Sequence, residues 1–403
     1  MDRAASPLMR RKHRPDYLLV ISVGMLVLLG LVVLYSISPI LSHKLLGDVS
    51  RNHFLYGQLV HIGVGLIGYF IGSQLHYSQW QKLLPFLIVI SGLSVLLLMI
   101  PGVGITKNGA TRWVGIGPFS YQPSEIIKFT LVILLASRFS QAVSDSFTKA
   151  RQNLGLAMAV LLILAGAVLL LQRDLGTMVV MAMMVVGIFF SSGAALKQVG
   201  VLLGTGLGLG ILSIILFPHR IARVVTFLKP EDTAASGGYH LNQALIAIGS
   251  GGLLGLGLGK SIQVYGYLPE AANDSIFAIV GETFGFIGSL GVIGLFGLLI
   301  YRGLRIGLNA PNRYAQLIVI GVIIWLGTQT AINMAAMLGL VPLTGIPLPF
   351  LSYGGTSLVM SMTAIGVVVN ISKYTQRGLY ADSSFRRGNG RTYHTYPSRS
   401  QGA

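Results

Sequence analysis

Ten long apolar segments dominate this sequence and leave few folds open to it. A helix that crosses a bilayer needs about 20 consecutive apolar residues, and the chain of 403 residues has ten segments of this kind. They lie at about 17–38, 54–75, 82–101, 123–140, 154–171, 175–193, 197–217, 275–300, 314–340 and 352–372. The sequence therefore predicts an all-α, polytopic membrane protein, a bundle of ten transmembrane helices.

The scarcity of charged residues excludes the soluble classes of protein. Only 10% of the residues are charged and 53% are hydrophobic, whereas a soluble domain has about 25% charged residues. A soluble fold of this size cannot hide so much apolar surface behind so few charges. No nucleic-acid partner is expected either, because a basic nucleic-acid-binding protein carries its charges on a polar surface that this chain lacks.

The distribution of Lys and Arg predicts the orientation of the bundle. With the N-terminus inside, 19 of the 29 Lys and Arg residues fall on the inner side and nine on the outer side, as the positive-inside rule requires. Both termini are therefore expected in the cytoplasm. The predicted organisation is a basic tail at 1–16, a ten-span domain at 17–372, and a disordered tail at 373–403, with a long outer loop at about 218–274 between spans seven and eight.

The cations on the outer side run against this bias and need an explanation. They are Lys44, Arg51, Lys107, Arg112, Arg173, Arg220, Arg223, Lys229 and Lys260. Snorkelling side chains at the membrane surface would account for any one of them. Taken as a set they favour an anionic ligand at the outer surface, because the same loops carry the most conspicuous polar motifs.

Acidic residues at predicted spans are functional candidates, because a charge at mid-bilayer costs about 2.5–3.5 kcal/mol on insertion scales. Glu125 has a structural alternative, a salt bridge with Lys128 one helical turn away. Asp174 opens a span, where a carboxylate caps a helix, and Glu282 has the same structural alternative as Glu125. Two interpretations of Asp274 stay open: it is a helix N-cap, or it is a general base that accepts the proton of a sugar hydroxyl.

Several other features of the sequence do not indicate a catalytic or cofactor site. The chain has no cysteine, so thiolate chemistry is excluded. The segment GLGLGKS at 255–261 lacks the first glycine of a phosphate-binding loop, and the histidines show no metal-ligand spacing. Gln329 and Asn333, one turn apart in a span, are interpreted as interhelical hydrogen-bond partners.

Five motifs in a fixed order resemble those of a known family. They are NGATRWVGIGPFSYQPSEIIKF at 108–129, QRDLGT at 172–177, RIARVVTFLKP at 220–230, QALIAIGSGGLLGLGLGKSIQVYGYLPEAANDSIFAIVGETFGFIG at 243–288, and LVPLTGIPLPFLSYGGTSL at 340–358. The chain resembles the SEDS family (shape, elongation, division and sporulation), which includes FtsW and RodA. The resemblance covers nearly all of 15–375, and two segments look closer to the division branch.

The resemblance implies a ten-span protein of the bacterial cytoplasmic membrane with both ends in the cytoplasm. It implies a peptidoglycan glycosyltransferase that polymerises lipid II, the undecaprenyl-pyrophosphate-linked disaccharide-peptide, into β-1,4 glycan strands at the outer face for septal wall synthesis. The partners it implies are a class B penicillin-binding protein, other division proteins and membrane lipid.

The resemblance also implies roles for residues of this chain. Asp274 matches the family's catalytic aspartate. The substrate-binding candidates are Arg112, Arg173, Arg220, Arg223, Lys260, Glu270 and Glu282. Cations among them would stabilise charge on a pyrophosphate leaving group, and a divalent cation, Mg or Mn, would share that role; its ligands are unknown.

The sequence departs from the family pattern around the aspartate. Ala272, Asn273 and Ser275 stand where the family usually has His-Thr before the aspartate and Phe after it, and Thr283 replaces a second glutamate. Arg173 stands where the family usually has proline. Two alternatives stay open: a flippase that moves lipid II between leaflets, and the elongation or sporulation paralogue of the same enzyme.

Overall fold

Each of the ten predicted spans contains a helix among the residues that the structure describes. The computed structural model describes residues 13–46, 52–107, 110–116, 119–141, 147–164, 166–167, 172, 174–228 and 237–375. The helices at the predicted spans are α1 (Tyr17–Leu46), α2 (His53–Gln74), α3 (Gln79–Leu97), α4 (Pro123–Phe139), α5 (Phe147–Leu164), α6 (Leu175–Ser191), α7 (Leu196–Leu216), α10 (Ile276–Leu308), α11 (Arg313–Met337) and α12 (Gly355–Ser372). The all-α, multi-pass prediction is confirmed.

Three of these helices are short for a membrane span. Within the described residues, seven helices are long and apolar enough to cross a membrane. Of the other three, α4 and α6 have only 17 residues each, and the apolar part of α5 is Gln152–Leu164. These short helices are supported by their neighbours, because α4 and α6 pack on each other and on α11. The predicted tails beyond 13–375 lie outside the described residues.

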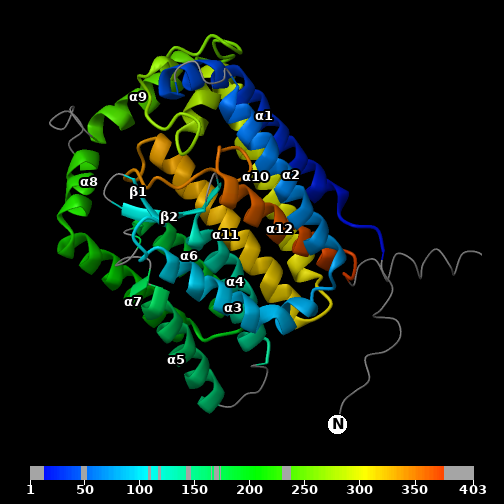
Figure 1. Ribbon diagram of the computed structural model, residues 1–403. Helices are drawn as coiled ribbons and strands as arrows, with labels where there is room; N and C mark the ends of the chain where they lie inside the picture. The colour runs from blue at the N-terminus through cyan, green and yellow to red at the C-terminus, as the bar shows by residue number, and fades with distance from the viewer. Residues whose placement is uncertain are drawn as a thin grey trace, which may run out of the picture.

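The outer loops contain structure that the span count does not predict. The loop after α3 forms a three-stranded antiparallel sheet in the order β1 (Gly104–Lys107), β2 (Ala110–Ile116) and β3 (Phe119–Tyr121). The long loop after α7 contains two more helices, α8 (Pro218–Leu228) and α9 (Gly237–Ser250). Figure 1 shows the sheet on the same side of the bundle as α8 and α9.

The core of the bundle lies around α11. This helix packs against α4, α6, α10 and α12, and two thirds of its most apolar window is buried, compared with about a sixth for α7. Figure 1 shows α11 crossing the middle of the molecule. Because α11 is enclosed by protein on most sides, its polar side chains must find partners on neighbouring helices.

Small residues bring α2 and α12 into close contact. A side-chain carbon at Gly72 would lie 2.6 Å from the Thr363 carbonyl oxygen, and one at Gly366 would lie 2.4 Å from the Tyr69 carbonyl oxygen. Both distances are too short for any residue with a side chain. Glycine at these two residues therefore allows the backbones of α2 and α12 to approach each other, as small residues do in membrane bundles.

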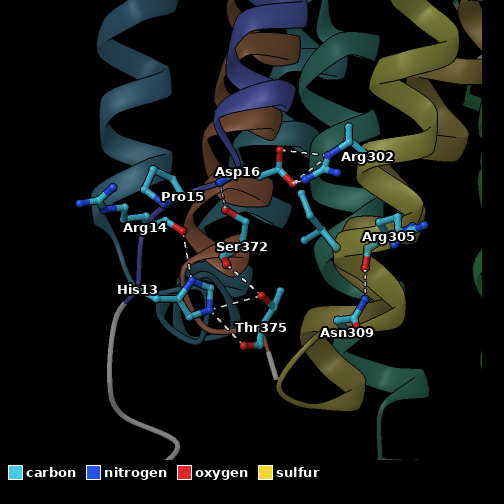
Figure 2. Close-up of a pocket in the computed structure, with 10 residues that line it drawn as sticks. His13, Arg14, Pro15, Asp16, Arg302, Arg305, Asn309, Ser372 and Thr375 are labelled. Carbon is cyan, nitrogen blue, oxygen red and sulfur yellow. Dashed lines mark hydrogen bonds and ion pairs between the residues drawn. The ribbon is translucent and has the colours of Figure 1, made fainter. Parts of the chain in front are cut away.

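The two ends of the described chain lie together at one end of the bundle. The His13 N–H donates to the Lys373 carbonyl over 2.9 Å, and the Asp16 N–H donates to Ser372 Oγ over 3.1 Å. Arg302, near the end of α10, forms an ion pair with Asp16. Figure 2 shows His13, Asp16, Arg302 and Ser372 around a small cavity, which has a volume of about 240 Å³. The location of both ends on one side of the bundle agrees with an even number of membrane-spanning helices.

Loops predicted to be on the inner side also meet at this end. Asn312, in the turn before α11, donates from Nδ2 to Tyr77 Oη over 3.1 Å, and its Oδ1 accepts from the Ala315 N–H as the N-cap of α11. The neighbouring Arg313 donates to the Ser191 carbonyl at the end of α6. We call this end of the bundle the terminal face, and the opposite end, with the sheet, α8 and α9, the loop face.

The loop after α9 is fastened to a kink in α10. Gly285 interrupts the helix with non-helical angles (φ 68°, ψ −161°), so nearby backbone groups are freed from the helical ladder. The Glu282 carbonyl accepts from the Leu256 N–H over 2.9 Å, and the Phe286 N–H donates to the Gly252 carbonyl over 2.9 Å. These bonds fix the loop that leads to Asp274.

Candidate active site

A cavity of about 830 Å³ opens on the loop face. Its walls come from α2, the three strands, α8, α9, the loop before α10, and the loop between α11 and α12 together with the first turn of α12. Four of the predicted site residues line it: Arg112, Arg223, Glu270 and Asp274. Segments far apart in the sequence therefore bring two cations and two carboxylates to one cavity.

Asp274 ends the loop before α10 and is 8% exposed. The N-cap of α10 is Ser275, so the N-cap interpretation of Asp274 is wrong. The Asp274 side-chain atom Oδ1 has no hydrogen-bond partner within the described residues. A buried carboxylate oxygen without a partner is costly, and this one lies at the wall of a cavity large enough for a ligand.

Burial raises the pKa of Asp274 from its ordinary value of 3.8 to about 7. That value already includes a smaller upward contribution from the nearby charge of Glu270 and a downward contribution from Arg223. Because the group changes its charge near neutral pH, it is suited to accept a proton in one step and release it in the next.

We expect activity at this site to rise with pH through about 7, because Asp274 acts as a base only when it is ionised. Glu270→Gln removes a negative charge that raises the pKa of Asp274, so the midpoint of the variant should move to lower pH. Initial rates of the wild type and the variant between pH 5.5 and 9 measure both midpoints. Identical midpoints would contradict the coupling of the two carboxylates.

The loop with Asp274 is held by α11 and by the loop before α12. Asn333 donates from Nδ2 to the Asp274 carbonyl over 2.8 Å and to the Ile346 carbonyl over 2.7 Å. The Tyr353 N–H donates to the Ala272 carbonyl over 2.8 Å. Gln329, one turn before Asn333, donates to the Pro347 carbonyl over 2.9 Å. The interhelical interpretation is confirmed for Gln329, which accepts from Lys128 Nζ on α4 over 2.7 Å, whereas Asn333 joins α11 to two loops and not, within the described residues, to another helix.

Asn333→Leu should lower kcat by about tenfold, because it removes the bond to the Asp274 carbonyl and the bond to the neighbouring Ile346 carbonyl, and small displacements of catalytic groups are costly. The protein should stay folded, with a reduced melting temperature. Asn370→Leu is the matched control: its amide joins α12 to the Ser73 carbonyl at the terminal face. Equal loss of kcat in the two variants would mean that Asn333 acts only through general stability.

The two cations of the cavity, Arg112 and Arg223, each interact with a carboxylate. Arg112, on β2, donates from Nε to the Gln172 carbonyl over 3.2 Å and lies 3.8 Å from Asp174 Oδ2. Arg223, on α8, donates to the Leu343 carbonyl over 3.4 Å. It interacts electrostatically with Arg112, Asp174 and Asp274. Two guanidinium groups close enough to repel each other are stabilised by an anion between them.

Gly345 lies close to both Asp274 and Arg112. A side-chain carbon at this residue would lie 3.7 Å from Asp274 Oδ2 and 4.0 Å from Arg112 Nη1. The carboxylate and the guanidinium are therefore both within about 4 Å of one position beside the loop backbone. A group bound there can give a proton to Asp274 while negative charge develops within reach of Arg112.

Asp174 has the capping role that its position predicts. Its Oδ1 accepts from the Thr177 N–H over 3.0 Å, and its Oδ2 accepts from the Thr177 hydroxyl over 2.9 Å. Both bonds fasten the first turn of α6. The same carboxylate forms the ion pair with Arg112, so the cap also fixes the position of that cation.

Glu125 and Lys128 form the buried salt bridge predicted for them. Lys128 Nζ lies 2.9 Å from Glu125 Oε1, and both side chains are at most 1% exposed. Lys128 also donates to Gln329 Oε1 over 2.7 Å. Because Gln329 holds the Pro347 carbonyl, this buried network supports the loop with Gly345.

The structure separates three other predicted site residues from the cavity lining. Arg220 is buried between α7 and α8, with its guanidinium 4.5 Å from the Phe217 ring centre. Lys260 is exposed in the loop after α9. Glu282 is fully buried and accepts from the Ile262 N–H over 2.8 Å and from the Gln263 N–H over 3.2 Å. Arg173 lies outside the described residues.

Several cavity residues were not singled out from the sequence. They are His61, Trp113, Gln122, His240 and Tyr353. Their motifs, RWVG and SYGG among them, lie in segments that the resemblance covers, but the resemblance assigns these residues no role. Histidine spacing offers no signal for His240, because its partners come from another part of the chain.

A divalent cation remains a prediction. The part of the chain that the structure describes contains no group of three or more His, Cys, Asp or Glu side chains that could hold a metal ion. The cavity offers two carboxylates, Glu270 and Asp274, next to two guanidinium groups. These side chains do not by themselves form a metal centre, so no step below depends on a metal.

Comparison with known proteins agrees with the fold and the motifs. Residues 16–377 match the model of the FtsW, RodA and SpoVE family, described as cell cycle proteins. Stage V sporulation protein E of Bacillus subtilis (strain 168) is 38% identical over 367 residues, covering 91% of this chain and 99% of that protein. A probable peptidoglycan glycosyltransferase FtsW of Coxiella burnetii is 37% identical over 364 residues, covering 90% and 97%.

Two solved structures share the fold over most of the chain. One, described as "Structural coordination of polymerization and crosslinking by a peptidoglycan synthase complex", has a TM-score of 0.69 at 27% identity and covers 90% of this chain and 99% of its own. The other is the rod shape determining protein RodA of Thermus thermophilus, with a TM-score of 0.64 at 28% identity, covering 90% and 98%. The matched length and these identities establish that the chain belongs to the FtsW, RodA and SpoVE family.

Proposed function

We propose that this chain is a peptidoglycan glycosyltransferase that polymerises lipid II into β-1,4 glycan strands. The observation that carries the proposal is the location of Asp274: a buried carboxylate whose pKa is raised to about 7, in one cavity with Arg112 and Arg223. Glycan polymerisation needs a base for a sugar hydroxyl and positive charge for a pyrophosphate leaving group. The names of relatives such as the Coxiella FtsW support the same reaction.

The reaction then proceeds in one displacement. The 4-hydroxyl oxygen of the acceptor sugar attacks the anomeric carbon of the donor, and its proton passes to the Asp274 carboxylate. The bond between the anomeric carbon and the pyrophosphate oxygen breaks, and the electron pair leaves with the pyrophosphate. Arg112 and Arg223 stabilise that charge. Attack from the opposite side inverts the α-linked donor and gives the β-1,4 bond.

We infer that the loop face points outward from the bacterial cytoplasmic membrane and that both termini are cytoplasmic. Support comes from the 19 Lys and Arg residues assigned to the inner side and from the hydrogen bonds that join the two ends of the described chain. A polymerase on the outer face meets lipid II after its transfer across the membrane.

We propose the division branch, with a class B penicillin-binding protein as the partner and with contacts to other division proteins. Similarity to proteins named FtsW supports the branch, and the solved peptidoglycan synthase complex supports a cross-linking partner. The identity with stage V sporulation protein E favours the sporulation paralogue as the second candidate. Complementation of conditional septation and sporulation mutants separates the two: restored septation supports the proposal, and restored sporulation alone contradicts it.

The reaction itself is tested with purified protein and fluorescent lipid II, with and without a class B penicillin-binding protein. We expect a ladder of glycan strands that a muramidase digests to disaccharide. If no strand forms under either condition, although the protein binds lipid II, the polymerase assignment is wrong.

A further inference from the structure

His240 lies at the cavity wall and is joined by hydrogen bonds to the loop with Asp274. It is on α9, whereas its partner Ser275 is the N-cap of α10. His240 Nε2 lies 2.7 Å from Ser275 Oγ, and Ser275 Oγ donates to the Pro269 carbonyl over 2.9 Å. Ser275 is fully buried, whereas the His240 ring lines the cavity.

These contacts fix which nitrogen of His240 carries the proton. A hydroxyl has one hydrogen, and Ser275 gives it to the Pro269 carbonyl, which can only accept. Ser275 Oγ must therefore accept from His240, so the proton is on Nε2. Burial lowers the pKa of His240, with Glu270 opposing and Arg223 adding to the shift. In the neutral ring Nδ1 is then a hydrogen-bond acceptor.

Nδ1 is the remaining polar atom of a ring that lines the cavity, and His240 makes no other hydrogen bond within the described residues. The carboxylates of Glu270 and Asp274 line the cavity with it. All three groups accept hydrogen bonds. A phosphate carries no donor to offer them and is repelled by the carboxylates, whereas the hydroxyl and amide groups of a sugar are donors.

We propose that His240, Glu270 and Asp274 form a saccharide subsite in which Nδ1 of His240 accepts a hydrogen bond from the sugar carried by lipid II. This inference rests on the proposed function. It divides the cavity into a part that binds the sugar and a part that binds the pyrophosphate. The acceptor groups contact the sugar, and the guanidinium groups of Arg112 and Arg223 contact the pyrophosphate. Ser275 is a positioning residue, because it acts by orienting the ring.

The contact depends on Ser275, one of the residues at which this sequence departs from the pattern of the resembled family. Ser275 stands where the resembled family usually has phenylalanine, whose ring cannot accept the Nε2 hydrogen bond. The tautomer of His240, and with it the acceptor at Nδ1, therefore depends on a residue in which this chain departs from the pattern.

Two replacements at residue 240 separate the contact to the sugar from the bond to Ser275. His240→Gln places its amide near the position of Nε2, so it keeps a donor for Ser275 and loses the acceptor at Nδ1. His240→Asn places its amide near Nδ1, so it keeps an acceptor for the sugar and loses the bond to Ser275. The probes are lipid II and undecaprenyl pyrophosphate, which lacks the sugars, and the Kd of each is measured with detergent-purified protein.

We expect His240→Gln to weaken lipid II binding by about three- to tenfold, the value of one hydrogen bond, and to leave the Kd for undecaprenyl pyrophosphate unchanged. His240→Asn should bind lipid II more tightly than His240→Gln. The reverse order, or an equal loss for both probes, would overturn the inference, and so would wild-type Kd values in His240→Gln. If the wild type binds lipid II but forms no glycan, the proposed reaction fails while this comparison still decides the contact.

Discussion

Asp274→Asn is expected to lower kcat for glycan formation by at least about a hundredfold, because a positioned general base contributes about 10²–10⁴ in rate. The amide has nearly the same shape as the carboxylate, so the cavity should keep its form. The change removes the one group in the described cavity that combines burial with a pKa near 7. KM for lipid II should change much less than kcat, since the amide oxygen can still accept a hydrogen bond from the sugar and the lost proton transfer occurs only in the transition state.

Asp16→Asn is the matched control for this experiment. Asp16 pairs with Arg302 at the terminal face, so the same chemical change is made far from the cavity. Its kcat should stay within about twofold of the wild type, because no catalytic group is moved. Strand formation by Asp274→Asn at the wild-type rate would show that another group accepts the proton.

Arg112→Gln is expected to lower kcat by about a hundredfold, because removal of one preorganised donor to developing charge costs about 10²–10³. The neutral side chain keeps a donor but loses the charge that stabilises the departing pyrophosphate. Asp174 should remain in place without its partner, since two bonds from Thr177 hold its carboxylate. Arg223→Gln should have a smaller effect, because Arg223 is more exposed and its field is more screened.

Single-turnover rates with saturating lipid II measure these effects on the chemical step. Arg305→Gln, an exposed arginine near the terminal face whose guanidinium lies 5.1 Å from the Tyr301 ring centre, is the control. If Arg112→Gln raises KM and leaves kcat unchanged, Arg112 binds the substrate in its ground state and does not stabilise the leaving group.

The helices of the bundle could be predicted because membrane physics acts on every residue of a span. A run of about 20 apolar residues has few alternatives to a transmembrane helix, and each predicted span is a helix in the structure. The pair Glu125–Lys128 could be predicted for a similar reason. A buried charge in this setting needs a partner, and Lys128 was the cation one turn away.

The sheet and the full set of cavity residues could not be predicted in this way. The strands of the first outer loop are three to seven residues long, too short to produce a clear alternation among glycines. Arg220, Lys260 and Glu282 share the charge and the predicted side of the cavity residues, yet each is elsewhere. The predicted topology assigns a residue only to one face of the membrane. Whether it lines the cavity depends on contacts between segments far apart in the sequence.

The departures from the family pattern became interpretable only with the structure. From the sequence alone, Ser275 is only a serine in place of the phenylalanine that the resembled family usually has. In the fold its hydroxyl oxygen lies 2.7 Å from Nε2 of His240, a residue on α9 that precedes it by 35 positions. Asn273 bonds to the Glu270 carboxylate in the same turn. Both residues bring polar groups to the loop that carries Asp274.

The most direct test of polymerase over flippase uses proteoliposomes in which fluorescent lipid II is confined to one leaflet. We predict glycan strands when lipid II is in the leaflet next to the loop face, no strands when it is in the other leaflet, and no transfer between leaflets in either case. Asp274→Asn should form no strands while binding lipid II as the wild type does. Transfer of lipid II between the leaflets without any strand would contradict the account.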